Sequence, residues 1–300
     1  MINGVNYSGY YIENSKNVFS SFNVNNSQDI RYAVRSDKNK DTMDMFGGVK
    51  TELAYEGVAP SFDGSDAQFS ITNRTSHNNR YSFLCSGSSN LFACIGLRSK
   101  QYCILNKQYT KEQYEKMVPK IIQHMNDMPY VDKKGRIYKY GEFFPSELSP
   151  FCYNETIAQE YFPLTKEEAL KQGYQWKDKE ERNYQIDIKN EDIPNDIKEV
   201  DKSIINKVIE CEHQGKCNEQ CTEAFKIIPD ELAFYQRMNL PLPHLCPNCR
   251  HYQRLKQRNP LKLWHRHCMK PNCPNEFETS YSPDRPEIVY CERCYQQEVY

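Results

Sequence analysis

Short clusters of β-forming residues recur along the first third of the chain. They begin about ten to thirteen residues apart, with one wider gap, and groups of Ser, Asn, Asp and Gly such as 25–27 and 63–65 separate them. Because these residue types form turns, the pattern predicts regular short strands with polar corners. Such an arrangement is typical of a coiled solenoid of strands or of a β-sandwich. The clusters occupy residues 18–22, 30–34, 42–46, 68–72, 81–85, 91–95 and 101–105.

Three cysteines in this region, Cys85, Cys94 and Cys103, lie nine residues apart. The equal spacing favours the solenoid, in which equivalent positions stack as a ladder inside the coil. The three thiols are candidates for a metal site, but single cysteines without a neighbouring partner are usually small core residues, and we expect them to be buried. The sequence therefore predicts a β-rich, solenoid-like domain over residues 1–106, with a sandwich as the alternative.

A helical connector is predicted for residues 107–203. Thr110 and Gln113 form a capping-box pattern, and the apolar residues that follow lie on one helical face over three turns. Pro119 interrupts this face and should kink or split the helix. We expect the face to close the open end of the β-domain rather than to form a groove for a partner. It comprises Tyr114, Met117, Val118, Ile121, Ile122 and Met125.

Two further helices are expected before the last third of the chain. Thr165 has the capping-box pattern of a short helix, and Gly173 should end it. Apolar residues from Ile197 to Val208 again have helical spacing, which predicts a helix over residues 196–210. An acidic stretch precedes it, and we place a domain boundary within residues 177–203.

The last region, residues 204–300, contains four cysteine pairs, two of which have the C-x-x-C spacing that lets two thiolates bind one tetrahedral ion. Four pairs predict two four-thiolate zinc sites, the first resembling a treble clef and the second a zinc ribbon. Cys211 and His213 remain as alternatives to Cys217 or Cys221. The predicted ligands are Cys217, Cys221, Cys246 and Cys249 in the first site, and Cys268, Cys273, Cys291 and Cys294 in the second.

Full thiolate ligation indicates that both zinc ions are structural. A catalytic zinc keeps an open position for water, and four thiolates leave none. The ions would instead fold a segment with almost no core of its own, because the free energy of zinc binding then becomes free energy of folding. Together these elements predict a multidomain α+β protein: a β-solenoid, a helical connector and a double zinc module.

Composition narrows the class of protein further. With 38% hydrophobic and 13% aromatic residues, the cores should be thin and rich in Tyr and Phe, and a net charge of −1 does not favour a general polyanion binder. No apolar run approaches the roughly 20 residues of a membrane span, and the N-terminus has no signal-peptide pattern. Paired spacing and an odd total of 13 cysteines favour metal thiolates in a reducing cytoplasm. Because no phosphate-binding or hydrolase motif occurs, a non-enzymatic role is favoured.

A basic segment lies between the two predicted zinc sites. Residues 244–270 contain seven Lys and Arg and no acid. Arg250, Arg254 and Arg258 fall on one helical face, about 6 Å apart along the axis, which suits a track of phosphates. With Lys262, and with Trp264 stacking on bases, they predict contact with RNA or single strands at low sequence specificity. The other interpretation is that several of these cations offset the negative charge of the thiolate sites. A protein–protein scaffold is then the alternative function.

The C-terminal part resembles a known group of proteins. The residues that carry the resemblance are 224–229, 240–243, 245–250, 258–260 and 286–291, together with 101–110 and the helix that follows. In these motifs the chain is similar to uncharacterised zinc-ribbon proteins that are frequent in environmental bacterial genomes with reduced gene sets. The resemblance covers about two thirds of the chain. It implies zinc binding and carries no established activity or substrate.

Overall fold

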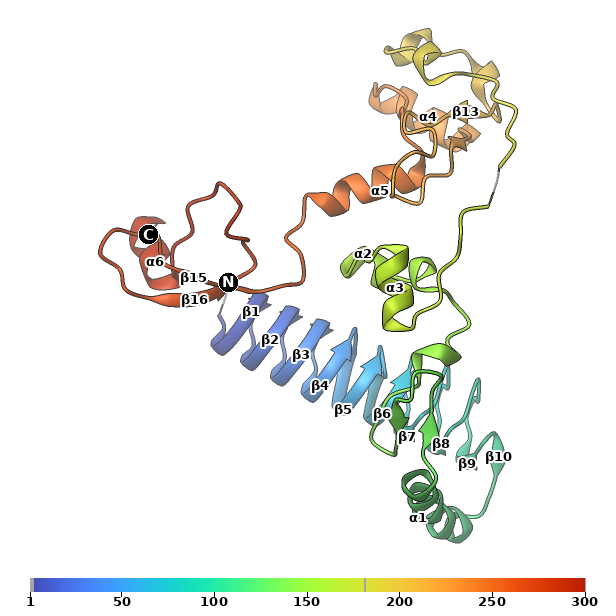
Figure 1. Ribbon diagram of the computed structural model, residues 1–300, viewed down its shortest axis with the longest axis vertical. Coiled ribbons are helices and arrows are strands. Elements are labelled where there is room, and N and C mark those ends of the chain that lie inside the picture. The colour runs from blue at the N-terminus through green and yellow to red at the C-terminus, as the bar shows by residue number, and fades with distance from the viewer. Residues whose placement is uncertain (1–2, 181, 300) are drawn as a thin grey trace. The chain divides into compact units, whose positions relative to one another are not determined.

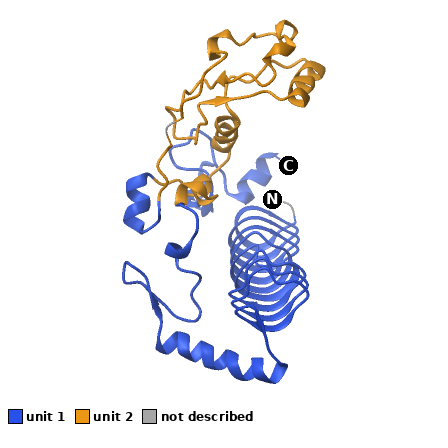
Figure 2. Ribbon diagram, turned by 90° about the vertical axis from the view of Figure 1, so that its right-hand side faces the viewer, with its two compact units in different colours: residues 1–152, 165–175, 261–300 blue, residues 153–164, 176–260 orange. Residues whose placement is uncertain are grey.

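The computed structural model describes residues 3–180 and 182–299, and the chain divides into two compact units. The first unit comprises Met1–Cys152, Thr165–Gln175 and Leu261–Tyr300, and the second comprises Tyr153–Leu164 and Trp176–Pro260 (Figure 2). The first unit thus joins the β-rich segment to the C-terminal end of the chain. We describe each unit by itself.

The first unit is built on a solenoid of about eight turns, which confirms the solenoid prediction and excludes the sandwich. Its strands follow one another in chain order in one sheet (Figure 1). Strands β1 to β9 are parallel, and between most neighbouring strands the register advances by twelve residues, as from Val18 to Ile30 to Thr42 to Ala54. Between β5 and β6 it advances by thirteen residues. The strands are β1 (Val5–Glu13), β2 (Lys16–Asn25), β3 (Gln28–Asp37), β4 (Lys40–Phe46), β5 (Val49–Val58), β6 (Phe62–Ile71), β7 (His77–Arg80), β8 (Ser89–Phe92), β9 (Gln101–Ile104) and the antiparallel β10 (Lys107–Gln108).

The corners of the coil are single residues in the left-handed backbone conformation. They recur at every third position, for example at Asn14, Asn17, Ser20, Asn23 and Asn26, whose φ angles are 46°, 55°, 48°, 56° and 49°. This conformation costs roughly 1–2 kcal/mol for most L-residues and is best tolerated by Gly, Asn and Asp. The polar groups between the β-forming clusters are therefore tight corners of a continuous coil.

Polar side chains inside the coil complete the backbone hydrogen bonding. The Ser15 hydroxyl accepts from the Ser27 N–H, the Ser27 hydroxyl accepts from the Asn39 N–H, and Asn39 Oδ1 accepts from the Thr51 N–H, each at 3.0 Å. Each bond joins residues twelve positions apart, so it links one coil to the next. Buried N–H groups need a partner, and here interior polar side chains supply it.

Removing one of these interior side chains is expected to destabilise the solenoid. Asn39 is 2% exposed, and its Nδ2 also donates to the Gly48 carbonyl at 3.1 Å. Asn39→Ala would leave the Thr51 N–H unpaired, while the Gly48 carbonyl would keep its bond from the Asp37 N–H, so we expect a loss of about 2 kcal/mol in the free energy of unfolding. Denaturant unfolding measures it. Asn25→Ala, at a part-exposed position of the preceding coil, is the control, and an equal loss in both variants would refute the role of Asn39.

The three cysteines of the solenoid are core residues, as predicted, but they do not stack at equivalent positions. Cys85, Cys94 and Cys103 are at most 1% exposed and form one buried cluster with Leu91. Their nine-residue spacing is three quarters of the twelve-residue coil. Consequently, they step diagonally, with Cys85 Sγ donating to the Cys94 carbonyl and Cys94 Sγ to the Cys103 carbonyl. The expected ladder of equivalent cysteines is therefore wrong.

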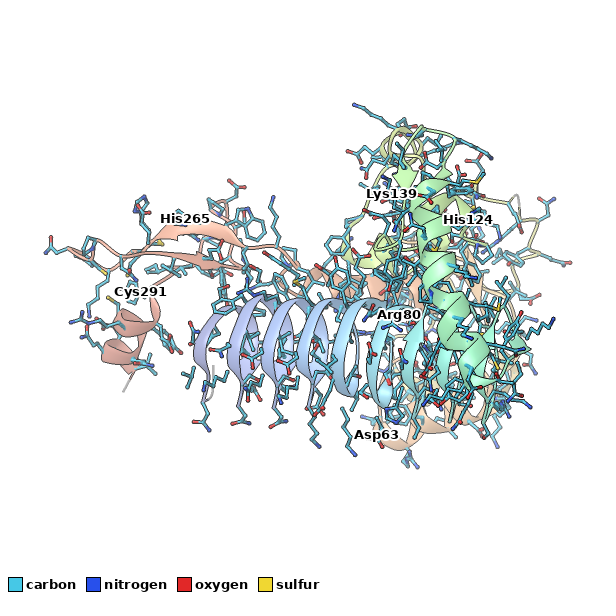
Figure 3. The ribbon with its side chains drawn as sticks, turned by 90° about the horizontal axis from the view of Figure 1, so that it is seen from below. Asp63, Arg80, His124, Lys139, His265 and Cys291 are labelled. Atoms are coloured by element: carbon cyan, nitrogen blue, oxygen red, sulfur yellow. The ribbon has the colours of Figure 1, made fainter. Side chains whose placement is uncertain are left out.

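Helix α1 (Lys111–Asp127) packs its apolar face on the last coils. The predicted capping box is present, with Thr110 and Gln113 bonding each other's backbone N–H, and the helix continues through Pro119 without splitting. Tyr114 and Val118 are buried in a cluster with Phe69, Tyr81, Phe92 and Ile104 of the solenoid. Figure 3 shows the helix, labelled at His124, beside the coils. This face is covered by the protein's own chain, so it is not a partner groove.

The C-terminal end of the chain packs at the first coil. It forms a hairpin of β15 (Trp264–His267) and β16 (Glu276–Thr279), followed by helix α6 (Glu292–Val299). The Tyr7 hydroxyl of β1 donates to the Glu292 carboxylate at 2.8 Å, and β16 contacts β1. Burial and this carboxylate raise the pKa of Tyr7 to about 12. Residues 288–290 form no strand, and β16 pairs with β15.

Short elements make up the rest of the chain. In the first unit, β11 (Tyr130–Val131) pairs with β12 (Ile137–Tyr138), and α3 (Lys166–Gln172) begins at Thr165 and ends at Gly173 as predicted. The second unit contains α2 (Ala158–Tyr161), β13 (Ile209–Glu210), β14 (Ala224–Phe225), α4 (Pro229–Met238) and α5 (Pro247–Lys256). Short 3-10 turns are η1 (Ser146–Leu148), η2 (Tyr153–Glu155), η3 (Asn190–Asp192), η4 (Ile197–Glu199) and η5 (Lys202–Ile204).

The helix expected over residues 196–210 is wrong. Asp196 and Asp201 each accept a hydrogen bond from a backbone N–H two residues ahead, and each begins a separate 3-10 turn. Local side-chain bonds of this kind compete with a continuous helix. The apolar residues still reach the core of the second unit, where Ile197, Val200 and Ile204 are buried. Among the described residues, no helix combines the length and apolar character that a bilayer crossing requires.

Candidate metal centres

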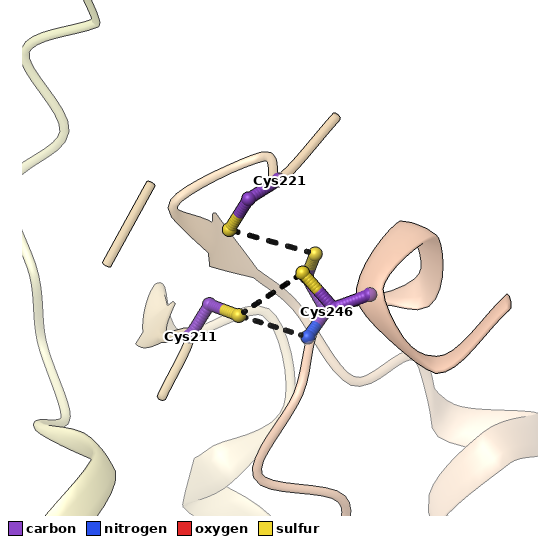
Figure 4. Close-up of side chains that lie close together, drawn as sticks. Cys211, Cys221 and Cys246 are labelled. Atoms are coloured by element: carbon purple, nitrogen blue, oxygen red, sulfur yellow. Dashed lines mark hydrogen bonds between the residues drawn. The ribbon is translucent and has the colours of Figure 1, made fainter. Parts of the chain in front are cut away.

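Four buried cysteines of the second unit converge on one point. They are Cys211, Cys221, Cys246 and Cys249, and their sulfur atoms lie within 4.8 Å of one another. Cys211 Sγ is 4.0 Å from Cys249 Sγ, and Cys221 Sγ is 4.0 Å from Cys246 Sγ. Figure 4 shows sulfurs of this cluster facing one another. Tetrahedral zinc with Zn–S bonds of about 2.3 Å places sulfurs about 3.8 Å apart, so the cluster fits this ion.

Local structure explains how this cluster forms. Cys211 follows β13 and Cys221 precedes β14, and the pairing of Glu210 with Ala224 brings the two cysteines together. Cys246 and Cys249 lie at the start of α5, where the positive end of the helix favours thiolates. The Cys246 N–H also donates to Cys211 Sγ at 3.2 Å. Burial tends to raise the pKa of Cys246, but hydrogen bonds from Thr222 and from the Cys249 backbone lower it to about 6.

The first cluster contains Cys211 where the main sequence prediction has Cys217. Cys217 lies in the loop between the two strands, partly exposed, with its Sγ 3.7 Å from Cys249 Sγ. Cys211 is one of the alternative ligands that the sequence offers, but nothing in the spacing of Cys211 and Cys221 distinguishes it. The signal lies in the strand pairing, because the register of β13 and β14 places Cys211 opposite Glu223, two residues after Cys221.

The second cluster joins the four cysteines that the spacing predicts for it. Cys268, Cys273, Cys291 and Cys294 have sulfurs within 4.8 Å of one another, and Cys273 Sγ is 3.9 Å from Cys291 Sγ. Cys268 directly follows β15, Cys291 directly precedes α6, and Cys294 lies in the first turn of that helix. The backbone N–H of Cys294 lowers the pKa of Cys291 to about 6. The chain thus has two four-cysteine clusters that could each hold a metal ion, consistent with two zinc ions.

Several cations of the basic segment form hydrogen bonds or ion pairs within the protein. Arg250 donates to the Tyr235 hydroxyl at 3.1 Å and lies 3.7 Å from Glu231. Lys256 pairs with Glu219, and Lys270 with Glu298. These contacts are those of cations that offset nearby negative charge. Sequence spacing alone does not reveal them, because the acids come from other parts of the chain.

The other predicted contact residues are exposed or only partly buried. Arg254 and Arg258 are exposed, and the Arg258 guanidinium lies 5.0 Å from the centre of the Tyr161 ring and donates to the Tyr161 hydroxyl at 3.5 Å. Lys262 lies over the Trp264 ring at 5.1 Å. The arginines belong to the second unit, and Lys262 and Trp264 to the first.

A groove on the solenoid was not foreseen from the sequence. It has a volume of about 980 Å³ and runs along one face of the coils, where Phe19, Tyr55 and a column of Asp29, Asp41 and Asp66 line it. Arg80, labelled in Figure 3, lies 3.8 Å from Asp66. The twelve-residue period that separates Asp29 from Asp41 is the signal that could have revealed this column.

Comparison with known proteins identifies no relative of this chain. No protein-family model, curated protein or solved structure matches the chain.

Proposed function

We propose that the protein is a non-enzymatic zinc protein whose basic helix contacts the phosphates of nucleic acid, RNA or single strands, with low sequence specificity. Two structural zinc ions would hold its C-terminal modules in shape. The resemblance to zinc-ribbon proteins supports the binding of zinc and gives no information about a partner. A cytoplasmic location follows from the same proposal, because thiolate sites persist in a reducing compartment.

The observation that carries the proposal is the exposed pair Arg254 and Arg258. These arginines lie one helical turn apart, at and just beyond the end of α5, and α5 itself is fixed to the first metal cluster through Cys246 and Cys249. A helix anchored in this way presents guanidinium groups at about the 6 Å spacing that successive phosphates can use. Arg250 is assigned to packing instead, because Tyr235 and Glu231 bind its guanidinium.

Trp264, in the first unit, is a separate candidate for stacking on the bases of a single strand. Base stacking on an aromatic ring is tolerant of sequence and contributes about 1–3 kcal/mol per base. Trp264 is only partly buried, and Lys262 lies over its ring. Stacking there would add affinity without sequence choice.

Reversing the exposed arginine pair is expected to weaken binding at least tenfold. Arg254→Glu/Arg258→Glu removes two cations and adds two anions on the proposed track, so electrostatic attraction to the phosphates is lost. Fluorescence anisotropy with a single-stranded RNA oligonucleotide measures the affinity. The matched control is Arg98→Glu/Lys100→Glu, two exposed solenoid residues with the same change in charge. Equal losses in both variants, or none in the first, would refute the track.

The salt dependence provides a second readout of the same contacts. Affinity should fall steeply between about 50 and 200 mM salt, and the slope of log K against log salt should decrease in magnitude by about 1.4 once two single-strand phosphate contacts are lost. A scaffold that binds protein through apolar contacts would show little salt dependence. Exposed Phe234, Met238 and Leu240 at the end of α4 favour that second candidate, since they are 44%, 53% and 41% exposed.

A further inference from the structure

We propose that His213, Cys217, Glu219 and Cys249 form a third metal site, in which Cys249 bridges a second zinc ion to the one in the first four-cysteine cluster. The four donor atoms lie within 4.8 Å of one another, all in the second unit. Cys249 belongs to both groups. The inference goes beyond the two structural ions of the proposed function and rests on the first cluster holding zinc.

The distances between donor atoms match those around a tetrahedral ion. Zn–S bonds of about 2.3 Å separate two sulfurs by about 3.8 Å, and Zn–N and Zn–O bonds of about 2.0 Å separate nitrogen from oxygen by about 3.3 Å. Cys217 Sγ and Cys249 Sγ are 3.7 Å apart, and His213 Nδ1 and Glu219 Oε2 are 3.3 Å apart. Both separations thus agree with one ion held by all four residues.

Two buried polar atoms point to a ligand at this place. His213 Nδ1 and Glu219 Oε2 are buried and lie 3.3 Å apart, but neither forms a hydrogen bond among the described residues. The Glu219 side chain is only 7% exposed, and its other oxygen is bound by Lys256. A buried carboxylate oxygen that accepts no hydrogen bond is costly. A metal ion between the two atoms would satisfy both of them.

The loop after β13 places the donors on one side. Tight turns, in which Gln214 N–H donates to the Cys211 carbonyl and Lys216 N–H to the His213 carbonyl, each at 2.8 Å, fold the chain back on itself. Gly215 allows this fold with a φ of 74°. Helix α5 then supplies Cys249 from its first turn and Lys256, which positions Glu219.

Charge and donor chemistry both favour zinc at this site. His nitrogen, Cys sulfur and carboxylate oxygen are all established zinc ligands. A second Zn²⁺ brings two positive charges, which the Cys217 thiolate and the Glu219 carboxylate offset. The site is also more accessible than the first cluster, because the His213 side chain is 29% exposed and Cys217 is partly exposed. This ion should therefore be the first that a chelator removes.

Native mass spectrometry of the full chain, loaded with zinc and freed of excess metal, tests the site. We expect three ions in the wild type and two in both Cys217→Ser and His213→Gln/Glu219→Gln. The matched control is His265→Gln/Glu276→Gln, which removes another His–Glu pair, 2.7 Å apart and exposed in the second zinc module. That control should keep three ions.

Other outcomes overturn the proposal. Two ions in the wild type would mean that the site does not bind zinc, while the two structural ions would stand. If Cys217→Ser bound only one zinc ion, Cys217 would be a ligand of a single mononuclear site and would not belong to a third site. A third ion that persists in His213→Gln/Glu219→Gln would be adventitious. Substitution with Co²⁺ tests the bridge, because two ions that share a thiolate should show magnetic coupling in electron paramagnetic resonance, and three uncoupled ions would refute the shared Cys249.

Discussion

Removal of zinc by a chelator is expected to unfold residues 261–300 while the solenoid stays folded. The buried cluster of this module consists of Cys268, Cys291 and Cys294, with only partly buried residues packed against it. Structural zinc contributes about 10–16 kcal/mol at neutral pH, which is comparable with the whole stability of a typical domain. The solenoid has its own interior, from Ile12 to Cys103, and no cysteine cluster of the metal-binding kind among its described residues.

Tryptophan fluorescence can follow this module selectively. The chain has two tryptophans, Trp176 and Trp264, and neither lies in the solenoid. In a Trp176→Phe variant the emission reports on β15 alone. We expect EDTA to shift this emission to longer wavelength and re-addition of zinc to reverse it, with the β-sheet circular dichroism largely retained.

A matched variant separates loss of metal from other effects of the chelator. Cys291→Ser/Cys294→Ser removes half of the second cluster and leaves the first one complete. In the Trp176→Phe background it should show the shifted emission without EDTA and bind one zinc ion fewer. An unshifted emission after zinc is lost, verified by elemental analysis, would show that this module folds without its metal.

The solenoid could be predicted from the sequence because its signal is periodic. Clusters of β-formers and polar corners fix the strands, yet the twelve-residue coil emerges only from the pairing of Val18 with Ile30 and of Ile30 with Thr42. The equal spacing of the cysteines indicates the correct class of fold, but for an incomplete reason. Nine residues are three quarters of a twelve-residue coil, so the cysteines do not occupy equivalent positions. Interior polar residues such as Asn39 could not be assigned, because a buried Asn and a turn Asn look alike in sequence.

The ligands of a metal cluster could be predicted where the short-range spacing of the cysteines determines them. They could not be predicted where strand pairing determines them. All four cysteines of the second cluster follow from their pairs. In the first cluster, the selection of Cys211 depends on β13 meeting β14 across a loop. His213, Cys217 and Glu219 come together only when that loop folds back toward α5. Likewise, the contact of Glu292 with Tyr7 joins residues that lie 285 positions apart, for which sequence offers no local sign.

A carboxylate placed under helix α1 is expected to detach the helix from the solenoid. Val118 is 9% exposed and packs in the cluster of Phe69, Tyr81, Phe92 and Ile104. Val118→Asp would lose this apolar contact and bury an unpaired charge, so we expect a loss of about 4 kcal/mol in the free energy of unfolding. Thermal unfolding and light scattering measure the effect, because the uncovered aromatic cluster should also promote association.

Two variants of the same helix test that burial is the cause. Lys116→Asp introduces the same side chain on the exposed face of α1 and should cost little. Tyr114→Phe removes a hydroxyl that is buried without a hydrogen-bond partner among the described residues, so stability should be retained or increase. If Lys116→Asp were as damaging as Val118→Asp, helix propensity rather than the contact with the solenoid would explain the loss. The contact is decisive because Tyr114 and Val118 are the residues of α1 that are buried in the aromatic cluster of the last coils.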